Sequence, residues 1–205
     1  MKNKLLVFGA IVCLAAILAA GTLAYFTDDV VTHNVITSSE IDISVQENVP
    51  NGKPIVDPET KEITGYSIEG VMPKTTETKE VKVRNDSMQT AWIRIRLSHT
   101  IKNKSGVTMP NAVDGVELIQ YPIPEEVKDN WIEKDGWYYY TKPVSGGAAT
   151  SLLIKEVKFA PEMDNPYQEC TVELSVNAQA VQYVHNGDET DDVMDARGWP
   201  EAPAN

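Results

Sequence analysis

The sequence predicts an all-β protein, a single antiparallel β-sandwich of jelly-roll-like form that follows an N-terminal signal helix. Apolar residues alternate with polar ones in several short runs, the pattern of half-buried strands. Glycine, proline and aspartate punctuate these runs at regular intervals, as in sandwiches of about eight to ten short strands. Helix signals are confined to residues 124–128, where a proline and two glutamates favour about two turns.

The alternating runs define the candidate core strands in chain order. The first places Ile41, Ile43 and Val45 on one face, with polar residues between them. Shorter runs follow at residues 81–83 and 93–97. The longest covers residues 172–180, where every second residue is aliphatic or alanine, and it is predicted to face the core.

A tight hairpin is predicted where Lys134-Asp135-Gly136 separates two aromatic runs, since glycine there permits a positive φ. Asn51-Gly52 and residues 57–60 are further turn signals. In the aromatic hairpin Tyr138 and Tyr140 share one face, and Trp137 and Tyr139 share the other. These four rings form either a contact surface for a partner or ordinary cross-strand packing.

The first 24 residues have the order of an export signal. Lys2 and Lys4 precede an uncharged apolar run over residues 5–24, and Thr22 and Ala24 supply the small residues of a peptidase site. Cleavage between Ala24 and Tyr25 is predicted. The alternative is a permanent anchor, because an apolar run of this length just spans a bilayer.

No linker or repeat divides residues 25–185, which are predicted to form one domain, and residues 186–205 are read as a mobile acidic tail that Trp199 tethers. The net charge of -12 repels phosphates and argues against nucleic-acid binding. Signal removal takes away two lysines and no acid. It also leaves Cys170 as the sole cysteine, so no intramolecular disulfide forms and this thiol is expected to be buried.

Residues with catalytic or ligating chemistry form no recognisable motif. His33, His99 and His185 are far apart in sequence, and only a fold that brought them together from distant strands would build a metal site. The acids of residues 188–195 miss the spacing of a calcium loop. Nucleophile, phosphate-loop and dinucleotide motifs are absent too, so neither a metal, a cofactor nor a catalytic residue is predicted.

The segment GTLAYFTDD at residues 21–29, with the alternating strand at 41–45, resembles the export signal and first strand of the TasA and camelysin family of Gram-positive bacteria. Ala24, Phe26 and Asp28 match that pattern, and residues 71–73 before 81–85 resemble the family's proline turn and next strand. The resemblance implies cleavage by a dedicated endoplasmic-reticulum-type signal peptidase, secretion and a jelly-roll-like sandwich. For TasA-like proteins it implies fibre assembly by insertion of an N-terminal strand into a neighbour.

The expected function is that of a secreted, non-enzymatic cell-surface or biofilm-matrix protein, specifically a self-associating fibre subunit. Ile41, Ile43 and Val45 are the candidate donor-strand residues. The expected partners are the signal peptidase during export, further copies of the chain, and matrix or surface components. Two alternatives stay open: a surface metallopeptidase, as camelysins were described, and an adhesive module that binds glycan or protein through the aromatic hairpin.

Overall fold

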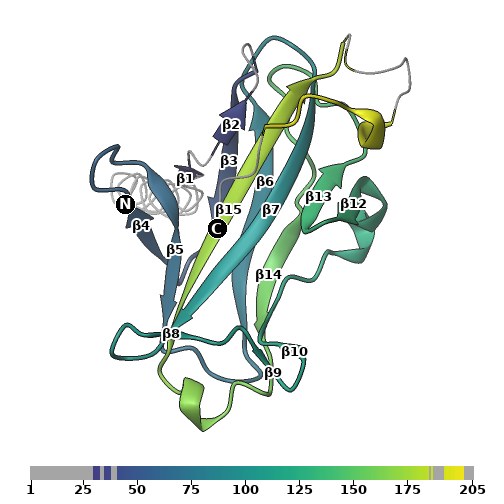
Figure 1. The fold of residues 1–205 in the computed structure, drawn as a ribbon. Helices are drawn as coiled ribbons and strands as arrows, with labels where there is room; N and C mark the ends of the chain where they lie inside the picture. The colour runs from purple at the N-terminus through teal and green to yellow at the C-terminus, as the bar shows by residue number, and fades with distance from the viewer. Residues whose placement is uncertain (1–29, 33–34, 38–40, 185, 187–191, 201–205) are drawn as a thin grey trace, which may run out of the picture.

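The computed structural model describes residues 30–32, 35–37, 41–184, 186 and 192–200 (Figure 1). The predicted signal segment, the cleavage site at Ala24 and Tyr25, His33, His185 and most of the acids in the tail lie outside these residues. Among the described residues, no helix has the length and apolar character needed to cross a membrane.

The first sheet has the strand order β1-β3-β6-β14-β11, with neighbouring strands antiparallel. Its strands are β1 (Val30–Thr32), β3 (Ile43–Asn48), β6 (Thr76–Asn85), β14 (Ile154–Phe159) and β11 (Ile119–Gln120). Side-chain alternation is clear in β6, where Val81 and Val83 are fully buried and Lys82 between them is not.

The second sheet has the order β12-β13-β7-β15-β5-β4, with β2 paired to β15 and β8 to β7. Its strands are β2 (Val35–Thr37), β4 (Lys53–Val56), β5 (Ile63–Glu69), β7 (Ala91–Lys102), β8 (Thr108–Met109), β12 (Trp131–Lys134), β13 (Trp137–Tyr140) and β15 (Thr171–Gln182). The two longest strands, β7 and β15, lie side by side in the middle of this sheet and pair along their whole lengths (Figure 1).

Smaller elements complete the chain. β9 (Ala112–Val113) and β10 (Val116–Glu117) form a separate two-stranded ribbon. Three short 3-10 helices cover Glu125–Asn130, Asn165–Tyr167 and Val193–Asp195. The first of these occupies the segment where the sequence predicts a short helix.

The two sheets enclose an apolar interior, which confirms the predicted all-β antiparallel sandwich. One core cluster is built around Ile43, Val45, Ile93 and Ile95, and a second around Ile68, Ile101, Phe159 and Leu174. A third cluster lies around Trp92, Trp137 and Val193 and covers the outer face of the second sheet.

The hairpin signals are confirmed. β12 and β13 pair from Trp131 opposite Tyr140 to Lys134 opposite Trp137. The two turn residues, Asp135 and Gly136, have φ angles of 53° and 75°, which a two-residue hairpin with the right twist requires. β4 and β5 form a second hairpin at the turn predicted for residues 57–60, in which Asp57 N–H donates to the Glu62 carbonyl.

One pair departs from the antiparallel pattern: β2 runs parallel to β15, from Val35 opposite Ala178 to Thr37 opposite Ala180. β1 pairs with β3 on the other sheet, and only two residues separate β1 from β2. The two short strands β1 and β2 thus pair with different sheets, β1 antiparallel to β3 and β2 parallel to β15.

Candidate functional site

The most distinctive site is the side of the sandwich where β3 faces β15 and β5. We call it the seam and define it by residues 45–49 of the first sheet with residues 63–68 and 171–180 of the second. At the seam Val30 of β1 lies opposite Glu47, and Thr32 lies opposite Val45. Residues 30–32 thus pair with β3 of the first sheet, and residues 35–37 pair with β15 of the second.

The edge of β15 that faces the seam is covered in two parts. β7 occupies the other edge along the full strand, so β5 and β2 must share this one. β5 covers Thr171 to Leu174, and β2 covers Ala178 to Ala180. Without β2, this second stretch of β15 would present unpaired backbone groups, the usual template for adding a strand.

Of the predicted donor residues, Ile43 and Val45 belong to β3, and Ile41 lies just before that strand. All three are buried in the core. β3 pairs with β6 along its whole length as well as with β1. Taking these residues out of the sheet would expose three aliphatic side chains, at about 1.5–3 kcal/mol each.

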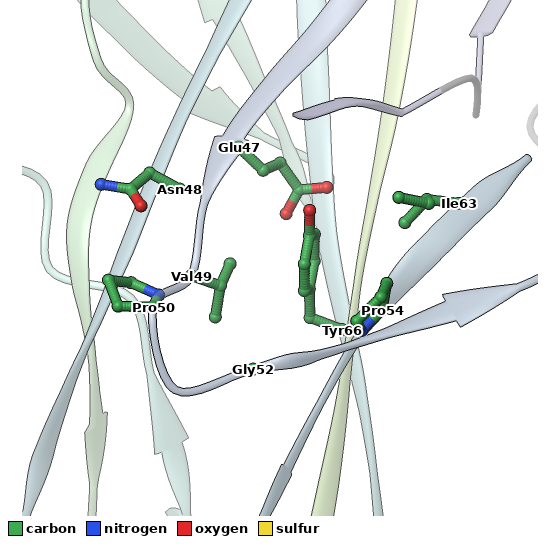
Figure 2. Close-up of a pocket in the computed structure, with 8 residues that line it drawn as sticks. All are labelled: Glu47, Asn48, Val49, Pro50, Gly52, Pro54, Ile63 and Tyr66. Atoms are coloured by element: carbon green, nitrogen blue, oxygen red, sulfur yellow. The ribbon is translucent and has the colours of Figure 1, made fainter. Parts of the chain in front are cut away.

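A cavity of about 240 Å³ opens at one end of the seam (Figure 2). Val49, Pro50, Pro54 and Ile63 form its apolar walls, and Glu47, Asn48 and Tyr66 are the lining residues with polar side-chain groups. Figure 2 shows the Tyr66 ring standing in the cavity with its hydroxyl directed toward the Glu47 carboxylate.

The turn beside this cavity depends on Gly52. Its N–H donates to the Val49 carbonyl over 2.9 Å, closing the turn that leads from β3 to β4. A Cβ at this position would lie 2.6 Å from the Val49 Cγ1 atom, closer than real contacts allow. The Asn51-Gly52 signal therefore marks the place where the chain folds back tightly against one cavity wall.

A buried ion pair lies beside the cavity. Lys79 Nζ donates to Glu47 Oε2, and both side chains are only 1% exposed. Lys79 Nζ also lies 5.5 Å from the centre of the Tyr66 ring. Burial, helped by the negative charge of Glu47, raises the pKa of Tyr66 to about 12. At neutral pH the phenol therefore keeps its proton beside the carboxylate.

The rings of the aromatic hairpin pack against other residues of the same chain. Tyr140 and Trp131 are buried in the core with Tyr138 packed against them, and Trp137 and Tyr139 are buried on the outer face. The two faces follow the predicted alternation, but both are covered. Little ring surface of Trp137, Tyr138, Tyr139 and Tyr140 is left for a partner, so the structure favours ordinary packing over a contact surface.

The tail covers the outer face through Arg94, which is 9% exposed. Its guanidinium lies 4.2 Å from the Trp137 ring centre and 4.7 Å from that of Trp199. It donates to Gln179 Oε1, to the Tyr139 hydroxyl and to the Pro200 carbonyl. Trp199 also meets Tyr139 edge-on, at 5.7 Å between ring centres. Residues 192–200 are thus held on the sheet at the predicted tether.

Replacing Trp199 with alanine should release this part of the tail. The loss of one cation–π contact and one aromatic pair is expected to weaken the attachment by about 1–2 kcal/mol. Trypsin should then cleave after the exposed Arg197 about tenfold faster, measured by mass spectrometry of timed digests. Met88→Ala is the matched control, since Met88 is 97% exposed. An unchanged rate in the Trp199 variant would mean that other contacts hold the tail.

The residues with ligating or nucleophilic chemistry lie apart. Cys170 is free and buried, as predicted, and burial raises the pKa of its thiol. His99 Nδ1 lies 3.1 Å from the Tyr121 hydroxyl. Burial lowers the pKa of His99, although the negative charge of Glu117 acts to raise it. Within the part of the chain that the structure describes, no three histidine, cysteine or acidic side chains group as metal ligands would.

Comparison of the chain with protein-family models, with curated proteins and with solved structures finds no match in any of the three.

Proposed function

We propose that this protein is a secreted structural subunit of the cell surface or biofilm matrix, and that it assembles by passing its N-terminal segment, residues 25–37, to a neighbouring copy. The observation that carries the proposal is that residues 30–32 and 35–37 pair with strands of different sheets, β3 and β15. Each of these two strands, β1 and β2, is only three residues long.

Exchange between copies requires little rearrangement. The segment lies at the N-terminal end of the predicted mature chain, so no crossover has to be undone before it leaves. A neighbour's β1 and β2 would form the same backbone hydrogen bonds with Val45–Glu47 of β3 and Ala178–Ala180 of β15. The monomer and the assembly then differ little in contacts, and concentration and charge decide which of them prevails.

Charge opposes the encounter between copies. The chain carries 30 acidic and 18 basic residues, and removal of the signal makes the balance more negative. Salt shortens the range of this repulsion to about 10 Å at 0.1 M, and acid neutralises carboxylates near pH 4. We therefore expect high salt, low pH or divalent cations to promote assembly.

The likeness of residues 21–45 to TasA and camelysin sequences agrees with this proposal.

The test is assembly of the mature chain, which begins at Tyr25, against a variant that lacks residues 25–37. The mature chain should form filaments by electron microscopy at about pH 4 or in high salt. The shortened chain should stay monomeric by light scattering under the same conditions. Trp199→Ala is the control, because its site lies on the outer face rather than at the seam, and it should assemble like the mature chain. Filaments from the shortened chain at the same concentration would contradict donation of this segment.

A further inference from the structure

The long strand β7 is paired along only part of one of its two edges. On the other edge β15 pairs with every residue of β7. On this edge β13 pairs with Arg94 and Ile95, and β8 pairs with Ile101 and Lys102 at the far end of the strand (Figure 1). Among the described strands, residues 96–100 therefore pair with β15 alone. The opening between the two flanking strands is about 20 Å long.

The backbone groups of Leu97 and His99 face this opening. In an antiparallel pair, every second residue directs both its N–H and its C=O to the same neighbour. Ala91 pairs with Gln182 of β15 on one edge, and on the other it exchanges two hydrogen bonds with Val144, over 2.9 and 2.8 Å. The register with β15 is unbroken along the whole strand, so Leu97 and His99 point the same way as Ala91. Within the described residues, neither has a backbone partner at the opening.

A groove of about 530 Å³ lies at the opening. Residues 96–100 line it as one continuous stretch, and Asn111 from the segment after β8 and Glu173 and Ser175 from β15 complete the lining. An unpaired strand edge beside open space is the usual template for the addition of an extended segment. The main chain of such a segment provides affinity, and its alternate side chains provide specificity.

One charge at the groove lacks a counter-charge. Glu173 pairs with Lys102 over 2.6 Å, whereas none of the ion pairs among the described residues includes Arg96. Leu97 packs against the core, so the alternation of the strand places Arg96 and Ser98 on the outer face. A segment added at the opening would present every second side chain on that same face. Charge complementarity therefore favours a carboxylate there.

We propose that the open edge of β7 at Leu97 and His99 binds an extended peptide segment of a partner protein, one that carries an acidic residue between two apolar residues. The acidic side chain lies beside Arg96 on the outer face, and the apolar side chains lie on the side of Leu97. The seam adjoins the opposite edge of the β7–β15 pair. Binding at this site is therefore separate from the proposed exchange of residues 25–37.

The first experiment titrates the mature chain with the peptide acetyl-Thr-Val-Glu-Val-Thr-amide at neutral pH, 0.15 M salt and low protein concentration. At a peptide concentration ten times the Kd, hydrogen exchange of the Leu97 and His99 amides, followed by NMR, should slow about tenfold. Exchange of the Ser98 and Thr100 amides should stay unchanged, because both face β15. The same peptide with both valine nitrogens methylated is the control and should not bind. Unchanged exchange at Leu97 and His99, or equal binding of the methylated peptide, would overturn strand addition at this edge.

The second experiment tests the acidic residue. Arg96→Gln should weaken binding of the peptide about twofold to fivefold, the range of a partly exposed ion pair. Arg84→Gln is the control, because Arg84 belongs to β6 of the first sheet, and it should bind like the mature chain. A peptide with glutamine in place of glutamate should lose the same factor on the mature chain and nothing further on the Arg96 variant. Equal affinity of the two peptides for the mature chain would overturn the assignment of an acidic segment. Both experiments measure the monomer, so a failure to form filaments would refute the proposed function and leave these results standing.

Discussion

Replacing Lys79 with methionine should lower the free energy of unfolding by about 3–5 kcal/mol, because the change leaves the buried Glu47 carboxylate without its cation. Methionine keeps most of the apolar stem of lysine, so the loss comes from charge rather than from an empty space. The two residues belong to adjacent strands, β3 and β6, beside the cavity at the seam. Denaturant unfolding followed by circular dichroism measures the change.

Two further variants test whether the loss of stability comes from the buried ion pair rather than from removal of any lysine charge. Lys104 pairs with Glu169 on the surface, where the side chains are 64% and 67% exposed, so Lys104→Met should change stability by less than about 1 kcal/mol. Combining Lys79→Met with Glu47→Gln removes both charges and should recover most of the loss. A Lys79 variant no less stable than the Lys104 variant would show that the buried pair contributes little.

Local patterns predict most of the sandwich. The alternating runs at 41–45, 81–83, 93–97 and 172–180 fall in or beside β3, β6, β7 and β15, and the Asp135-Gly136 turn falls between β12 and β13. These features depend on side-chain alternation and on turn conformations, which neighbouring residues determine. The same rule sorted the hairpin rings into two faces. It could not show that the tail covers one of them, because that contact joins residues far apart in the chain.

The strand pairing at the seam and the buried ion pair beside it were harder to predict from the sequence. Alternation does carry one signal: position 47 continues the face of Ile43 and Val45, and position 79 continues that of Val81 and Val83. Both therefore point inward, and a buried pair was predictable as soon as the two strands were known to be neighbours. The register of β3 against β6 depends on residues far apart in the sequence, and so does the parallel pairing of β2 with β15. The burial of Ile41, Ile43 and Val45 between the two sheets depends on the same long-range pairing.

In the proposed assembly, residues 25–37 must leave their own sandwich before two copies can join. A covalent bond that holds β1 on its own β3 should therefore abolish assembly altogether. Val31 and Gln46 lie directly opposite each other in this antiparallel pair. Such pairs have Cα atoms about 4.5–5.5 Å apart, within the range that a disulfide spans. Cys170 is buried and does not compete with a pair of cysteines placed there.

The most direct measurement is electron microscopy of the mature Val31→Cys/Gln46→Cys chain, oxidised and then reduced, at about pH 4 where carboxylates are neutralised. The oxidised protein should remain a folded monomer. Addition of a reductant to the same sample should produce filaments at the rate of the mature chain, which makes the sample its own control. Filaments that form equally well while the intramolecular disulfide is intact would contradict strand exchange as the mechanism of assembly.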